Sequence, residues 1–147
     1  MNIQKINHII LVSIFVACML LTTCSEDPKP LTEAEQVTKL LTNGTWTLAS
    51  VSVDDTQAND LFEEFSLTFT KIGFTSTGTT PVWPRTGTWS FTNPDEPDQF
   101  MRDDEVKVDI ISLEEDSLTL ELTWTKQTIV GGRMLSIKGK HVFILIQ

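Results

Sequence analysis

Two cysteines, Cys18 and Cys24, carry the strongest nucleophiles of the chain, and both lie near its N-terminus. Residues 9–21 form an apolar run that contains Cys18 and ends shortly before Cys24. Lys5 places a positive charge ahead of this run. A positive start and a short apolar run before a cleavage point are typical of a secretory signal. The run is shorter than the ~20 residues that a membrane-spanning helix needs, so we expect the segment to be removed.

The surroundings of Cys24 resemble the signal peptide of bacterial lipoproteins. Leu21 lies three residues upstream, and the polar residues Ser25-Glu26-Asp27 follow directly. In that family a lipid is attached to the cysteine thiol and the chain is cut before the cysteine. The resemblance therefore implies a leader over residues 1–23, a lipidated Cys24 and a membrane anchor. Cys18 is the alternative acceptor, although cleavage there would leave apolar sequence on the mature end.

The acidic residues after Cys24 carry a second resemblance. A serine followed by acids at this place is similar to the surface-export signal of lipoproteins in the Bacteroidetes. It implies an outer-membrane lipoprotein on the cell surface, and a periplasm-facing location is the alternative. Residues 24–31 are polar and contain two prolines, so they predict a short tether. Once lipidated, Cys24 leaves the mature chain without a thiol for disulfides, catalysis or metal binding.

The remaining side chains show no pattern that predicts catalysis. His141 is the one histidine after the leader, and no Gly-x-Ser-x-Gly motif is present. Paired carboxylates such as Glu63-Glu64 would point to opposite faces of a strand and would not converge on one substrate. We therefore predict a non-enzymatic protein without a cofactor.

Acidic residues dominate the charge. The net charge is −9, and it becomes −10 without the leader, whose one charged residue is Lys5. This charge disfavours nucleic acid as a partner. The acids crowd most closely between residues 95 and 105, where carboxylates would suit calcium. The spacing of a calcium-binding helix–loop–helix is absent, so we predict a solvated loop and no metal site.

Hydrophobic periodicity predicts a short helix followed by strands. Thr32 and Glu35 form a capping box at the start of the helix, and Asn43-Gly44 predicts its end. The period then changes to two, most clearly where Leu118, Leu120, Leu122 and Trp124 alternate with polar residues. Seven or eight such strands without crossover helices predict an all-β fold. We expect an antiparallel up-and-down β-barrel or a strongly curved meander.

Gly44-Thr45-Trp46 resembles the first signature of the lipocalins, in which the tryptophan packs across the closed end of the barrel. Gly87-Thr88-Trp89 and residues 110–120 are similar to the lipocalin-like domains of Bacteroidetes lipoproteins. The resemblance covers roughly residues 40–147, and we assign residues 32–147 to one lipocalin-like domain. The chain lacks the Thr-Asp-Tyr signature of the family, since it contains no tyrosine.

Nine apolar residues are predicted to point into the barrel, where they line a ligand cavity or fill the core: Trp46, Leu67, Phe69, Trp89, Phe91, Val108, Leu120, Leu122 and Trp124. An eight-stranded barrel holds one small ligand or fills itself with side chains. One hypothesis is therefore binding of a small apolar or amphipathic ligand. The alternative is an interaction or accessory module with a filled barrel, whose loops contact an envelope protein or a glycan. Trp83, in a loop between Val82 and Pro84, is the candidate partner contact or a lid over the barrel end.

Overall fold

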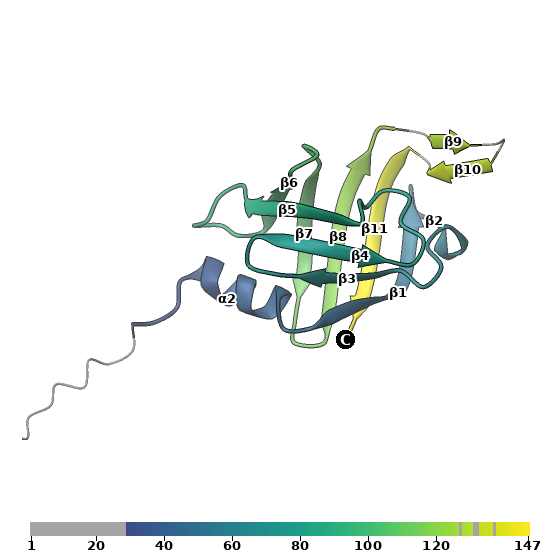
Figure 1. Ribbon diagram of the computed structural model, residues 1–147. Coiled ribbons are helices and arrows are strands. Elements are labelled where there is room, and N and C mark those ends of the chain that lie inside the picture. The colour runs from purple at the N-terminus through teal and green to yellow at the C-terminus, as the bar shows by residue number, and fades with distance from the viewer. Residues whose placement is uncertain (1–28, 127, 131–132, 137) are drawn as a thin grey trace, which may run out of the picture. The chain divides into compact units, whose positions relative to one another are not determined.

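The computed structural model describes residues 29–126, 128–130, 133–136 and 138–147 (Figure 1). Cys18, Cys24, the leader 1–23 and the first part of the tether 24–31 lie outside the described residues. The helix and strands below all belong to the compact unit Leu31–Gln147. None of the helices in the described part of the chain is long and apolar enough to cross a membrane.

Eight antiparallel strands form a closed up-and-down barrel, which confirms the predicted fold class (Figure 1). Each strand pairs with the next one along the barrel wall, and the last strand pairs with the first to close it. This architecture is consistent with a lipocalin-like fold. The barrel strands are β1 (Thr45–Val53), β3 (Ser66–Phe69), β4 (Gly73–Thr77), β5 (Thr86–Phe91), β6 (Gln99–Arg102), β7 (Lys107–Leu113), β8 (Ser117–Trp124) and β11 (Gly139–Ile146).

Three further strands lie outside the barrel wall. The short β2 (Thr56–Gln57) pairs with β1 and is followed by the 3₁₀-helix η2 (Asn59–Leu61). Strands β9 (Thr128–Val130) and β10 (Arg133–Ser136) pair with each other in a separate hairpin.

Alternation of apolar and polar residues determines which side of each strand faces inward. In β8, Leu118, Leu120 and Leu122 are at most 1% exposed, while the residues between them face outward. Burying one such side chain stabilises the fold by roughly 1.5–3 kcal/mol. In β1 the register against β11 shifts between Leu48 and Ser50, which places a β-bulge at Ala49.

Helix α2 (Glu33–Leu41) forms where the capping box predicts it. The Thr32 side chain accepts a hydrogen bond from the Glu35 amide at 3.2 Å, and the Glu35 carboxylate accepts one from the Thr32 amide at 2.8 Å. At the other end of the helix, Trp46 Nε1 donates to the Leu41 carbonyl at 2.9 Å. This bond ties the helix to the first barrel strand.

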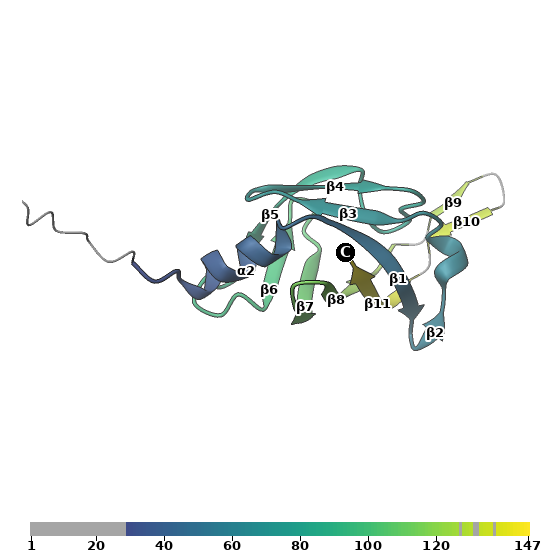
Figure 2. The same ribbon diagram turned by 90° about the horizontal axis from the view of Figure 1, so that it is seen from below.

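The barrel has two distinct ends (Figure 2). Helix α2, the 92–98 loop and the 114–116 turn lie at one end, named here the helix end. The 54–65 loop with β2 and η2, the 78–85 loop and the 103–106 turn lie at the opposite end, named the far end.

Candidate functional site

The interior of the barrel is filled by the residues that were predicted to face it. Seven of the nine are at most 7% exposed: Trp46, Leu67, Phe69, Trp89, Val108, Leu120 and Leu122. The other two, Phe91 and Trp124, are half-buried at the helix end and the far end respectively. Phe100 of β6 and Phe143 of β11, which were not among the nine, are fully buried beside them.

Aromatic rings connect the two ends of the barrel in an unbroken series. Successive ring centroids lie 5.1–6.4 Å apart along Phe62, Phe65, Trp83, Phe74, Phe69, Phe100, Trp89 and Phe91. These separations lie in the range in which aromatic pairs attract each other. The rings therefore occupy the space that an enclosed ligand would need.

Trp83 belongs to this core. Its burial contradicts the interpretation as an exposed partner contact and agrees with the alternative, a side chain packed over the barrel end. Its side chain is 2% exposed, and its ring lies 5.4 Å from Phe74 and 6.1 Å from Phe143. The 78–85 loop folds inward because its backbone is held on both sides. Ser76 Oγ donates to the Pro84 carbonyl at 2.8 Å, and the Thr79 amide donates to the Glu63 carbonyl at 2.8 Å.

Gly78 permits the close approach of the two far-end loops. Its φ of +71° lies in the left-handed region, and a Cβ there would come 2.2 Å from the Glu64 carbonyl oxygen. The 78–85 and 54–65 loops can therefore pack directly against each other. Together they carry Phe62, Phe65 and Trp83 over the far end of the barrel.

Arg102 is a buried charge that the sequence analysis missed. Its Nε donates to Asp104 Oδ1 at 2.9 Å and its Nη2 to Asp104 Oδ2, while Nη1 donates to the Val82 carbonyl at 3.0 Å. The guanidinium carbon lies 4.6 Å from the Trp83 ring centroid, a cation–π distance. Trp83 Nε1 itself has no acceptor among the described residues. The Trp83 side chain is thus held by ring packing and by Arg102.

His141 is the one titratable imidazole in the core. It is 1% exposed, stacks on Phe143 at 6.1 Å and contacts Phe62 edge to face at 6.1 Å. Burial lowers the pKa of His141 below its ordinary value of 6.5, while the Gly139 carbonyl and Asp54 partly oppose the shift. The folded state therefore favours the neutral ring.

Acidification is expected to destabilise the fold through His141. Because its pKa is lower in the folded state, the unfolded chain binds the proton first, so stability falls as the pH drops below 6.5 towards the folded pKa. The loss is about 1.4 kcal/mol for each unit by which the pKa is lowered. Urea unfolding between pH 7.5 and pH 5 measures it. The His141→Gln variant should show a shallower pH dependence, and an unchanged slope would contradict the prediction.

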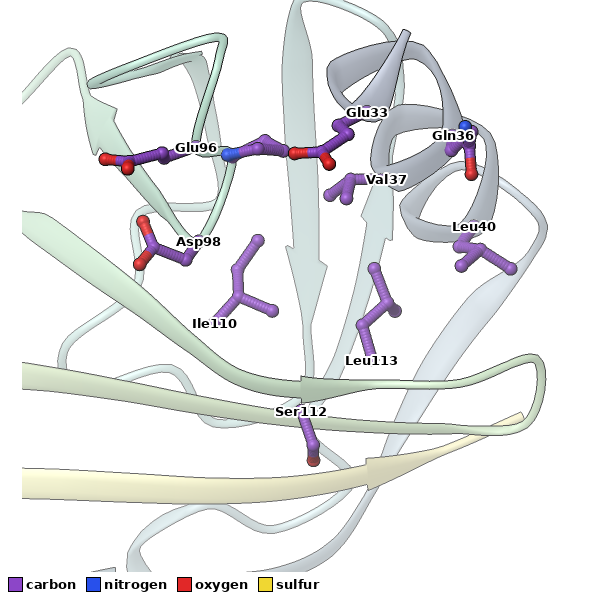
Figure 3. A pocket seen from close by; sticks show the side chains of 10 residues that line it. Glu33, Gln36, Val37, Leu40, Glu96, Asp98, Ile110, Ser112 and Leu113 are labelled. Atoms are coloured by element: carbon purple, nitrogen blue, oxygen red, sulfur yellow. The ribbon is translucent and has the colours of Figure 1, made fainter. Parts of the chain in front are cut away.

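An open groove lies at the helix end of the barrel, between helix α2 and strand β7 (Figure 3). Ile110 and Leu113 pair with the inward-facing Leu120 and Leu118 of β8, so the groove borders the end of the barrel core. Its volume is about 660 Å³. The floor is apolar, with Val37 and Leu40 of α2 facing Ile110 and Leu113 of β7 (Figure 3). All four side chains are only partly buried, so they leave apolar surface in contact with water.

Carboxylates form the rim of this groove. Glu33 projects from the first turn of α2, and Glu96 and Asp98 belong to the 92–98 loop (Figure 3). No basic side chain is among the ten residues that line it. The predicted acidic loop is thus exposed, and two of its residues border an apolar surface. None of the floor residues was predicted from the sequence to belong to a binding site.

Short-range hydrogen bonds hold the acidic loop in place. The Asp95 amide donates to Asn93 Oδ1 at 3.1 Å, and Asn93 Nδ2 donates to Glu96 Oε2 at 3.3 Å. The Ile110 amide donates to the Asp98 carbonyl at 2.7 Å, which joins the loop to the strand that forms the groove floor. This bond fixes the position of the loop carboxylates relative to the β7 side of the floor.

Within the described residues, no three His, Cys, Asp or Glu side chains come together in a way that could hold a metal ion. Compared with known proteins, the chain matches no protein-family model, no curated protein and no solved structure at a significant level.

Proposed function

We propose that this protein is a lipid-anchored, non-enzymatic module of the bacterial cell envelope that binds its partner outside the filled interior of a lipocalin-like barrel. The observation that carries the proposal is the series of aromatic rings from Phe62 to Phe91. A pocket for a small molecule typically needs 300–1,000 Å³ of space. In this barrel the interior holds side chains, which favours surface interaction over transport of an enclosed ligand.

The anchor is proposed from the sequence around Cys24. An apolar run of 13 residues, a cysteine and an acidic tether support a lipoprotein of the outer membrane, on the cell surface or facing the periplasm. A single acyl chain binds a membrane only marginally, whereas two or more hold a protein stably. The tether of residues 24–31 is short, so the barrel would work close to the membrane surface.

Replacing Cys24 by alanine is expected to abolish lipid attachment and release the protein from membranes. The measurement is metabolic labelling with an alkyne-tagged fatty acid, followed by separation of membrane and soluble fractions. Cys18→Ala is the matched control and should keep both the label and the membrane association. Label that persists in Cys24→Ala but disappears in Cys18→Ala would move the anchor to Cys18. An unlabelled wild-type protein would overturn the anchor altogether.

The filled interior can be tested separately with decanol, an uncharged alkyl alcohol that the carboxylates neither attract nor repel. Decanol is expected to leave the amide resonances of the interior residues Phe69 and Phe100 unchanged, because both side chains are buried and their rings pack against each other and against Trp89. Saturable shifts at these residues would show a ligand inside the barrel and would overturn surface binding as the mode of action.

A further inference from the structure

We propose that the groove between helix α2 and strand β7 is a binding site for a soluble amphiphilic organic cation, a molecule with one apolar chain or ring system and an amine head. The inference rests on the proposed function, since it assigns a ligand class to a groove at the helix end of the barrel, beyond its filled interior. It depends on three properties of the groove: its size, its apolar floor and the sign of its rim.

The size and floor fit the apolar part of such a molecule. The volume of about 660 Å³ falls within the range of small-molecule pockets. Val37, Leu40, Ile110 and Leu113 face this space from two elements, and each keeps part of its surface in water. Covering this surface with an alkyl chain or ring removes apolar area from water, which favours binding.

The rim selects the charge of the head group. Glu33, Glu96 and Asp98 stand around the apolar floor, and no lysine, arginine or histidine lines it. Glu33 and Glu96 belong to different elements, so negative charge borders the floor from two sides, with the Glu96 carboxylate pointing away from Glu33 (Figure 3). A cation gains from this arrangement, whereas an anion of the same shape is repelled.

The chain's own tether is a poor occupant of the groove because its charge has the same sign as the rim. Glu26 and Asp27 precede the helix by a few residues, and the chain as a whole carries a net charge of −9. A second copy of the chain would bring the same net charge against the rim. Charge complementarity therefore favours a separate cationic molecule.

The test compares decyl probes that share one tail and differ in head group, each below its micelle-forming concentration. They are titrated against the mature chain, residues 24–147, carrying Cys24→Ala. Decyltrimethylammonium is expected to shift the amide resonances of Gln36, Leu40 and Ser112, which line the groove. Its affinity should fall as sodium chloride is added, since salt screens exposed charges. Decyl sulfate should leave these resonances unchanged.

Two variants and one matched control show which groove residues contact the probe. Glu33→Gln, Glu96→Gln and Asp98→Asn combined should weaken decyltrimethylammonium about tenfold, if each exposed carboxylate contributes about 0.5 kcal/mol. The matched control changes the same net charge at the far end through Asp55→Asn, Asp60→Asn and Glu63→Gln, and should bind as the parent does. Val37→Thr, which keeps the shape of the side chain and adds a hydroxyl, should weaken binding several-fold.

The outcomes separate this inference from the proposed function. No shift with decyltrimethylammonium, equal shifts with decyl sulfate, or equal affinity of the groove and far-end triple variants would each overturn the cation site. None of these results affects the anchor or the filled interior. Shifts at Phe69 and Phe100 with decanol would instead overturn the proposed surface mode of action, whatever happens in the groove.

Discussion

Replacing Phe143 by alanine is expected to lower the free energy of unfolding by about 4 kcal/mol. Phe143 is fully buried on β11, the strand that closes the barrel against β1. Its ring centroid lies 5.2 Å from that of Phe62, 5.6 Å from Phe65 and 6.1 Å from Trp83. Alanine would remove contacts to both far-end loops at once and leave a cavity that the rigid barrel wall can fill only partly.

Ile144 provides the matched control for this prediction. It is the next residue on the same strand, but it points outward and is 45% exposed. Ile144→Ala should therefore change the free energy of unfolding by less than about 1 kcal/mol. Guanidinium unfolding of both variants, followed by tryptophan fluorescence, measures the difference. Equal losses in the two variants would mean that the contacts of the Phe143 ring with the far-end loops do not stabilise the barrel.

The parts of the fold that the sequence predicted correctly depend on local patterns. The capping box of Thr32 and Glu35 needs only four consecutive residues. The alternation in β8 continues over eight residues, so it identifies both the strand and its inward face. The closing of the barrel is predicted only indirectly. It is inferred from a series of strands that each have one apolar face and that no helical crossovers connect.

The far end could not be predicted in the same way. Strand β6 is only four residues long and follows an acidic loop, so its alternation of Phe100 and Arg102 is too brief to stand out. An arginine in a sequence also predicts a surface position, because charged side chains are seldom fully buried. The two prolines beside Trp83 predict a loop but not its direction. The direction depends on Phe143 and Arg102, which are distant in the sequence.

The groove was missed for a related reason. Its floor combines Val37 and Leu40 with Ile110 and Leu113, roughly seventy residues further along the chain. Each pair, taken alone, has the pattern of ordinary core residues. In the folded protein α2 lies beside β7 and covers these four side chains only in part. The carboxylates of the 92–98 loop lie at the edge of the apolar surface that remains exposed.

Replacing Asp104 by alanine is expected to cost about 3 kcal/mol of stability, because it leaves the Arg102 guanidinium buried without its counter-charge. The Arg102 side chain is 0% exposed, and two of its nitrogens donate to the Asp104 carboxylate. Asp104 is 29% exposed, which places the loss at the lower end of the range for a broken buried pair. Asp103, its exposed neighbour, supplies the control, and Asp103→Ala should cost about 0.5 kcal/mol or less.

A double-mutant cycle separates the ion pair from the rest of the far end. Arg102→Met removes the buried charge and keeps an unbranched side chain beside Trp83, so adding Asp104→Ala to it should cost far less than Asp104→Ala alone. The expected coupling energy is about 2 kcal/mol, measured by urea unfolding of the four proteins. Additive losses would show that Asp104 does not stabilise Arg102. Trp83 would then be held by its ring contacts to Phe65, Phe74 and Phe143 and by an Arg102 side chain that does not need Asp104 to stay in place.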